Sequence, residues 1–234
     1  MATFHVQVEG LTGLTISGSS TPTEDELTQF LNDGVHDVTS KSIASNPVSA
    51  EEFSRESAIQ TSNGFNPGTS KILSVIRESG TDGEWYPCRK ERIALQYKVT
   101  NPESLSYASK YNPVYMVTQN RNVHVYPEPG SSNDGFRVLY VNSSPEEGDG
   151  TALVHGSSDI KWFPNNKVYL VVLYASIKCL EHKMAAYTHT DEDTELAQVI
   201  AGNVAAMKAS YAGAFAGGAV QRQPQQPQQQ GARR

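Results

Sequence analysis

The most regular apolar pattern in the chain lies between residues 163 and 187. Taken alone, the run 168–174 fits either a buried strand or a helix, because periodicity does not distinguish the two over so few residues. Apolar residues continue at helical spacing beyond the length of a typical strand, at Leu170, Leu173, Tyr174, Ile177, Leu180 and Met184. Pro164 suits the first helical position, where its missing N–H costs nothing. The pattern therefore predicts a helix on which the core is built.

The part of this segment that carries no charge is short. It spans residues 168–177, between Lys167 and Lys178, which is about half of the roughly 20 apolar residues that a membrane-spanning helix needs. The segment is therefore predicted to be a buried helix and not a membrane span.

A second helix is predicted directly after the first. Thr190 is a good N-cap, and acidic residues in the first turn suit the positive end of the helix dipole; they are Asp191, Glu192, Asp193 and Glu195. The apolar stripe of this helix consists of Leu196, Val199, Ile200, Val204, Met207 and Tyr211, among alanines that allow another helix to approach closely. The link of residues 188–190 is short, so the two helices should form an antiparallel hairpin.

Three features are predicted before residue 57. Residues 2–8 alternate apolar and polar side chains, which predicts a strand-like arm within residues 1–20. Thr21 to Glu24 has the pattern of a capping box and predicts a helix over residues 22–42. Residues 49–53 predict one further short helical turn.

Short apolar runs separated by turn residues predict strands between residues 70 and 142. These runs are residues 72–76, 84–88, 113–117, 123–126 and 136–141. Because helices are predicted on both sides of them, the expected fold class is α+β. A helical body, made of the N-terminal helix and the C-terminal antiparallel hairpin, would carry a small antiparallel β-module inserted at about 57–160. Residues 21–215 would then form a single domain.

Two segments lack an apolar period. Residues 143–159 are rich in Gly, Ser, Glu and Asp and are expected to form an exposed loop. Residues 216–234 contain a Gln/Pro-rich stretch of low complexity that cannot build a core. This tail is expected to be disordered in the free protein or to dock on another surface.

Charge and cysteine content narrow the classes of function. The net charge of −6 argues against a nucleic-acid-binding surface, because phosphate recognition needs clustered Lys and Arg. Cys88 and Cys179 lie far apart in the sequence, and the first residues show no secretory signal. Both cysteines are therefore expected to be free thiols in a reducing cytoplasm.

No arrangement of residues predicts catalysis. His155 and Asp159 lie with two serines in one short loop, but residues so close in sequence cannot form the base, nucleophile and orienting group of a triad. Cys179, His182 and His189 resemble a metal site only superficially, because a paired C-x-x-C or H-x-x-x-H motif is missing. The chain is expected to be a non-enzymatic protein without a metal ion or cofactor.

The order of elements resembles a known family. Three features carry the resemblance. The first is the capped N-terminal helix, and the second is the β-module, in which residues 112–117 lead to residues 123–127. The third is Phe163-Pro164, which is followed by a long helix and then by a second helix that begins with acidic residues. This arrangement is similar to the head-to-tail adaptor proteins of tailed bacteriophages, the neck or connector subunits that are also called tail tubular protein A in short-tailed phages. The likeness covers residues 22–212.

The resemblance implies a homo-oligomeric ring, in the family usually a dodecamer, that binds the phage portal protein on one side and a tail or nozzle protein on the other. The ring would lie in the neck of the virion, at the head–tail interface, after synthesis in the host cytoplasm. DNA would pass through its channel without specific binding, since an acidic subunit repels phosphates. No membrane takes part.

The expected contact residues lie on the second helix of the hairpin and beyond it. Those facing a neighbouring subunit would be Leu196, Ile200, Val204, Met207 and Tyr211, and those docking on the portal would be Tyr211, Phe215 and Val220. The alternative is that the same stripe forms the core of the hairpin itself, because an apolar helix face usually packs within its own chain. A second class of function also stays open, namely an outer virion component, such as a capsid decoration or tail protein, without an axial ring.

Overall fold

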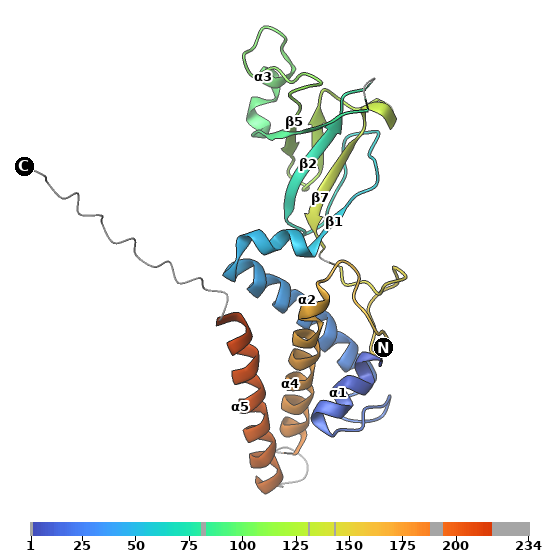
Figure 1. Cartoon of the computed structure of the whole chain (residues 1–234), viewed down its shortest axis with the longest axis vertical. Coiled ribbons are helices and arrows are strands. Elements are labelled where there is room, and N and C mark those ends of the chain that lie inside the picture. The colour runs from blue at the N-terminus through green and yellow to red at the C-terminus, as the bar shows by residue number, and fades with distance from the viewer. Residues whose placement is uncertain (1, 81–82, 131, 143, 188–193, 217–234) are drawn as a thin grey trace, which may run out of the picture.

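The structure is a computed structural model, which describes residues 2–80, 83–130, 132–142, 144–187 and 194–216. A β-module extends from one end of a helical body (Figure 1). The predicted α+β class is confirmed, and the strands lie between the N-terminal helices and the C-terminal hairpin in sequence.

Helix α4, Val168–Ala186, forms the centre of the helical body. It contacts α1 (Phe4–Thr12), α2 (Glu24–Ser45) and α5 (Thr194–Ala216). Figure 1 shows α1 and α5 on opposite sides of α4, while α2 crosses it. Because three helices cover it, α4 is buried on more than one face, at Val171, Val172, Leu173, Ala175, Ser176, Ile177, Cys179 and Leu180.

The two helices of the C-terminal hairpin run antiparallel, as the short link predicted (Figure 1). Pro164 does not begin α4 as predicted. It has an extended backbone and precedes a short 3-10 helix, η4 (Asn165–Lys167), which leads into α4. The predicted N-cap Thr190 and the acidic residues 191–193 lie outside the described residues. Of the helices described, none is both long and apolar enough to cross a membrane.

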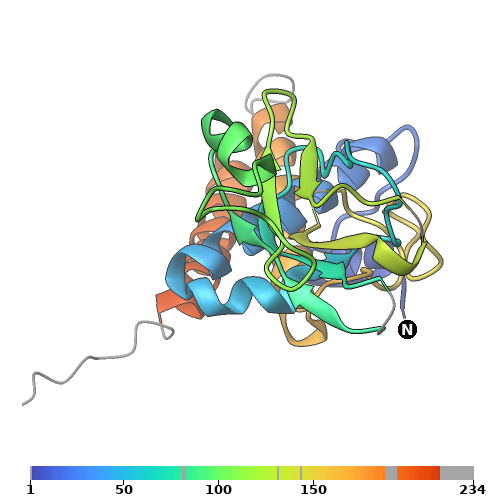
Figure 2. The same cartoon turned by 90° about the horizontal axis from the view of Figure 1, so that it is seen from above.

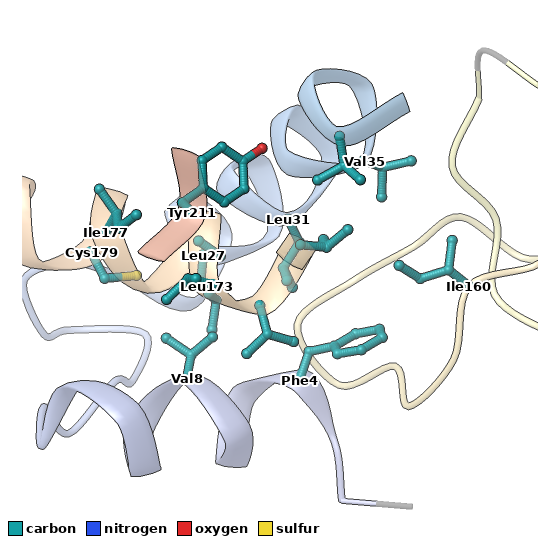
Figure 3. Packing of buried hydrophobic residues seen from close by; sticks show 14 of the residues in the cluster. Phe4, Val8, Leu27, Leu31, Val35, Ile160, Leu173, Ile177, Cys179 and Tyr211 are labelled. Carbon is teal, nitrogen blue, oxygen red and sulfur yellow. The ribbon is translucent and has the colours of Figure 1, made fainter. Parts of the chain in front are cut away.

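The core of the body collects side chains from all four long helices. Figure 3 shows Phe4 and Val8 of α1 pointing toward Leu27 of α2 and Leu173 of α4, with Tyr211 of α5 on the other side. The core is therefore built on α4, as the apolar pattern indicated.

The prediction of a strand at residues 2–8 is wrong, because this segment is helix α1. Phe4 and Val8 are one helical turn apart, and both are fully buried against the body. Val6 lies between them and is 56% exposed. The apolar alternation was misleading because only the pair four residues apart faces the core.

The helix predicted over residues 22–42 is α2, and it begins two residues later. Its capping box consists of Thr23 and Glu26 and not of Thr21 and Glu24. The Glu26 N–H donates to Thr23 Oγ1 at 3.3 Å, and the Thr23 N–H donates to Glu26 Oε2 at 2.8 Å. The helical turn predicted near residue 50 is the 3-10 helix η1, Pro47–Phe53, which follows α2.

The β-module contains two small sheets. The first has the strand order β1-β7-β2-β3 and is antiparallel, with bounds Ser54–Glu56, Phe136–Val141, Ile72–Glu78 and Trp85–Pro87. The second has the order β4-β5-β6, with bounds Arg89–Lys90, Val114–Val117 and Val123–Tyr126. In the second sheet β5 and β6 are antiparallel, whereas β4 and β5 are parallel. Short helices complete the module, namely η2 (Ile93–Leu95), α3 (Gln96–Thr100) and η3 (Ser132–Asp134).

The loop between β7 and α4 is not simply exposed, as predicted, but belongs to the helical body. Leu153, Ser157 and Ile160 are buried. The N–H groups of Phe4 and His5 donate to the carbonyl oxygens of Ser157 and His155, at 2.8 and 2.9 Å. The first N–H groups of a helix have no partner within it, so α1 needs the acceptors that this loop supplies. The last strand of the β-module is therefore β7, and the loop that follows it is not part of the module.

Candidate subunit interface

The inner face of α5 packs on its own chain. The buried residues on this face are Ala197, Ile200, Val204 and Tyr211, while Met207 and Phe215 are partly buried against the same core. Most of the residues predicted to contact a neighbouring subunit are therefore part of the hairpin's own core, which was the alternative interpretation of the stripe. Leu196 differs from them, because it is exposed.

Tyr211 fixes the end of α5 to α2. Its hydroxyl donates a hydrogen bond to Asp37 Oδ2 at 2.5 Å, and Lys41 Nζ lies 2.7 Å from the same carboxylate oxygen. The ammonium group of Lys41 also lies 4.7 Å from the centre of the Tyr211 ring, within the range of a cation–π contact. Burial, together with the bond to Asp37, raises the pKa of Tyr211 above its usual value. Tyr211 therefore faces its own chain rather than a partner.

The outer face of α5 is almost free of charge. Within the described helix the charged residues are Glu195 and Lys208, and Lys208 is paired with Glu181 at 2.7 Å. The residues opposite the buried face are Val199, Gly202, Ala206, Ala209 and Gly213, and all of them are exposed. Val199 is 62% exposed. A helix face in contact with water normally carries charged and polar residues, so this face has the composition of a packing surface.

Two glycines on this outer face have no role within the protomer. A Cβ atom added to Gly202 or Gly213 would meet no atom within 4 Å, and neither glycine has a positive φ. A glycine inside a helix costs about 1 kcal/mol relative to alanine. The protomer therefore loses stability at both positions, while another backbone could approach closely there.

Helix α1 presents a second uncharged outer face. Val6 lies on the side of α1 opposite the buried Phe4 and Val8, and it is 56% exposed. A Cβ atom at Gly10 would also meet nothing within 4 Å. Glu9 is the acidic residue of this helix, and its carboxylate is turned to the chain itself, where it accepts a hydrogen bond from the Ile16 N–H at 2.8 Å. This face was not predicted from the sequence, because residues 2–8 were assigned to a strand.

The outer faces of α1 and α5 lie on opposite sides of the helical body. Figures 1 and 2 agree on this placement, with α1 at one edge of the molecule and α5 at the other. One protomer can therefore present both faces at the same time, each to a different neighbour.

A third exposed surface, which we name the cap, lies at the far end of the β-module (Figure 1). The cap comprises residues 89–111, with five Lys or Arg residues against two Glu residues. Its exposed apolar side chains are Ile93, Tyr97, Leu105, Tyr107 and Tyr111. The cap is therefore basic and rich in tyrosine in a chain that is acidic overall, a local bias that the net charge conceals.

The structure describes two of the three residues that were predicted to dock on the portal. Phe215 is partly buried, with its ring centre 5.2 Å from that of Tyr211. Val220 lies outside the described residues. The structure therefore brings together Tyr211 and Phe215, and Tyr211 is the less accessible of the two.

The loop around His155 has the geometry of a structural contact. His155 Nδ1 lies 3.2 Å from Thr28 Oγ1, and its Nε2 lies 3.9 Å from Glu24. The Ser157 hydroxyl donates to Glu147 at 2.9 Å and not to the imidazole. These contacts join the loop to α2, with Thr28 and Glu24 of α2 as the partners of the imidazole.

The cysteines are free, and burial raises the pKa of both thiols to about 12. A thiolate is therefore scarce at neutral pH. Within the ranges that the structure describes, no three His, Cys, Asp or Glu side chains gather in an arrangement that could bind a metal ion.

Comparison with protein-family models and with curated protein sequences finds no match to this chain.

Proposed function

We propose that the chain is the subunit of a ring that joins the capsid portal to the tail, as head-to-tail adaptors do. In this ring the outer face of α5 of one subunit packs against the outer face of α1 of the next. The observation that carries the proposal is the pair of outer faces on opposite sides of α4 that carry almost no charge, marked by Val199 on α5 and Val6 on α1. The order of elements, which resembles that of adaptor proteins, supports the same function.

The physical argument for a ring is the position of the two faces. A contact between two different surfaces is heterologous and repeats from copy to copy, which gives a ring where the rotation closes and an open filament where it does not. Small residues at Gly202, Ala206 and Gly213 allow two helix backbones to come close, which increases the number of dispersion contacts. From the resemblance, we expect the ring to be a dodecamer.

The charge distribution supports passage of DNA without binding. Residues 2–56 carry nine acidic and two basic residues. Except for residues 54–56, which form β1, they belong to the N-terminal part of the helical body, which the ring would place near its axis. An acidic wall repels a polyanion and so lets it slide. In this proposal the ring has no enzymatic activity and needs no cofactor.

The cap is the surface that we assign to the adjoining tail or nozzle protein. It lies farthest from the helical body (Figure 1), and its exposed Tyr and Arg residues are of the types enriched in protein interfaces. Leu105 is fully exposed at this end and would fill a pocket of the partner. The portal would bind on the opposite side of the ring, with the protein located in the neck of the virion.

The test is the size and shape of the purified full-length protein. We expect sedimentation and electron microscopy to show a closed ring with an open axis. Val199→Glu and Val6→Glu should each reduce assembly by about tenfold or more, since each buries an unpaired charge in the contact. Asn203→Glu places the same charge on the flank of α5 and serves as the matched control, which should still assemble.

Three outcomes would contradict the proposal or a part of it. A protein that remains a monomer at all concentrations would exclude a self-assembling ring. A trimer without a central opening, bound to capsid shells and not to portals, would instead support an outer virion component. Equal assembly of Val6→Glu and the native chain would show that α1 is not the surface that receives α5.

A further inference from the structure

The cap, which contains α3 (Figure 1), combines an exposed surface with an ordered base. Val99 and Ala108 are buried against β5 and β6. The Ala108 N–H donates to the Val99 carbonyl oxygen at 2.9 Å, and the Gln96 side chain donates to the Tyr126 hydroxyl at 2.7 Å. A surface that is already ordered loses less conformational entropy when a partner binds. The cap is therefore suited to binding without first having to fold.

Leu105 lies in a hydrogen-bonded turn of the cap. The Ser104 N–H donates to the Asn101 carbonyl oxygen at 3.0 Å, and the Tyr107 N–H donates to the Ser104 carbonyl oxygen at 3.0 Å. The Ser106 N–H donates to the Ser104 hydroxyl at 3.2 Å. Turns are usually occupied by Gly, Pro, Asn, Asp and Ser, whereas Leu105 is fully exposed between two serines. The turn thus presents a large apolar side chain to water, where it adds no burial to the protomer.

The cap also carries positive charge that its own glutamates do not balance. Arg89 pairs with one of the two glutamates at 3.4 Å. Lys90, Arg92 and Lys98 are exposed, and within the described ranges no carboxylate pairs with them. They outnumber the remaining glutamate of the cap, which is Glu103. Charges of one sign on an interface favour a partner surface of the opposite sign, so the cap favours an acidic surface.

The apolar residues of the cap favour a protein over a nucleic acid as this partner. Proteins that bind single strands stack the bases on aromatic side chains. Leu105 and Ile93 are exposed but have no aromatic face, and Tyr111 packs edge to face on Tyr86, with ring centres 5.5 Å apart. Protein interfaces instead combine an apolar centre with a polar rim. The complementary surface is therefore an apolar pocket surrounded by carboxylates.

We propose that the cap binds an acidic surface of a partner protein, with Leu105 in an apolar pocket and Lys90, Arg92 and Lys98 paired with carboxylates at the rim. The chemistry of the partner follows from the cap itself, whereas its identity as the adjoining tail protein rests on the proposed function. The rim pairs are exposed and are therefore weakened by salt.

The experiment measures binding of the full-length protein to a labelled random copolymer of glutamate and tyrosine, read by fluorescence anisotropy. This probe presents carboxylates and apolar side chains on one polypeptide, and polyglutamate of the same length reports on charge alone. We expect the copolymer to bind about fivefold or more tightly than polyglutamate, because it also buries apolar surface. Salt at about 0.5 M should release most of both probes.

Three variants assign the binding to the cap. Lys90→Glu should weaken the binding of both probes by about threefold or more, since an attraction becomes a repulsion. Lys71→Glu is the matched control, because it makes the same change at an exposed lysine beside α2, and it should bind as the native chain does. Leu105→Ser should remove the advantage of the copolymer and leave the binding of polyglutamate unchanged. All three variants should sediment as the native protein does.

Several results would overturn the inference. Equal losses in Lys90→Glu and Lys71→Glu would show a nonspecific effect of charge, and equal binding of the two probes would show that Leu105 fills no pocket. Tighter binding of oligothymidylate, or of vesicles with anionic lipid, would assign the cap to a nucleic acid or to a membrane. Altered sedimentation of Leu105→Ser would assign the cap to another copy of this chain.

The same measurements separate this inference from the ring. A native protein that forms no ring but binds the copolymer through Lys90 and Leu105 would contradict the proposed function and support the acidic partner. A ring that binds neither probe would contradict the acidic partner and leave the ring in place.

Discussion

The hydroxyl of Tyr211 donates a hydrogen bond to the carboxylate of Asp37, which joins the last turns of α5 to the middle of α2. The two residues are 174 positions apart in sequence. Lys41 completes the arrangement by pairing with Asp37 and lying over the Tyr211 ring. This contact determines which face of α5 is turned inward, and therefore which face is left for a partner.

Removal of this hydrogen bond should destabilise the hairpin. Tyr211→Phe keeps the ring in the core but leaves Asp37 with Lys41 as its partner. We expect a loss of about 1–2 kcal/mol in the free energy of unfolding, measured by urea denaturation, since the bond is made to a charged group. Tyr169→Phe removes a hydroxyl from a side chain that is 58% exposed and should change stability by less than about 0.5 kcal/mol.

Helix α1 can be distinguished from a strand by two substitutions. Phe4→Ala should cost about 3–5 kcal/mol, because the ring is fully buried between α1 and the body. Val6→Ala should cost less than about 0.5 kcal/mol in the isolated protomer, because its side chain is largely exposed. Thermal unfolding of both variants measures the difference. Similar losses at Phe4 and Val6 would support the alternating pattern of a strand instead.

Two glycines should respond in opposite directions to alanine. At Gly34 a Cβ atom would lie 3.1 Å from Tyr174 Cδ1 and 3.3 Å from the Val171 carbonyl oxygen. The backbone oxygen cannot move aside without shifting α4, so we expect Gly34→Ala to lose about 1 kcal/mol despite its better helix propensity.

Gly202→Ala is the matched variant on the open face of α5. Nothing lies within 4 Å of the added atom, so the protomer should gain about 0.5–1 kcal/mol in the free energy of unfolding. Both variants are compared by urea denaturation at a protein concentration below that of assembly. A gain at Gly34 would show that α2 and α4 are less closely packed than described.

The capping box at the start of α2 predicts a pH dependence. The hydrogen bond from the Thr23 N–H is the largest cause that lowers the pKa of Glu26, with a hydroxyl hydrogen bond from Thr23 and the charge of His182 acting in the same direction. A carboxyl group whose pKa is lower in the folded state stabilises the fold above its unfolded pKa of about 4.5. This contribution is lost as the pH falls through the folded value.

Glu26→Gln tests this dependence, because the amide still accepts the bond but has no charge. We expect a loss of about 0.5–1 kcal/mol at pH 7, which diminishes as the pH falls through the lowered pKa of Glu26. Asp25→Asn removes a charge from the same turn without touching the cap and serves as the control. A loss that stays the same throughout an acid titration from pH 7 would show that the charge of Glu26 plays no part.

Local signals in the sequence predicted the order of elements well. The capped helix α2, the strands β2, β5, β6 and β7, and the antiparallel pair α4 and α5 all appear close to their expected positions. Each of them is determined by residues near one another in sequence, such as the Thr and Glu of a capping box or the apolar period of one helix. The capping box itself was placed two residues early, because both Thr21 and Thr23 precede a glutamate at a plausible spacing.

By itself, the sequence determined most of the helices and strands, though not α1, and that residues 163–187 carry the core. Only the tertiary structure decided which sides of these elements are buried. Phe4 and Val8, and not Val6, face the body because α4 and the loop at Ser157 lie on that side of α1. Ile200 and Val204 face inward while Val199 faces outward because Tyr211 binds Asp37 of a distant helix. Burial depends on neighbours that are far apart in the chain, and a local apolar pattern does not identify them.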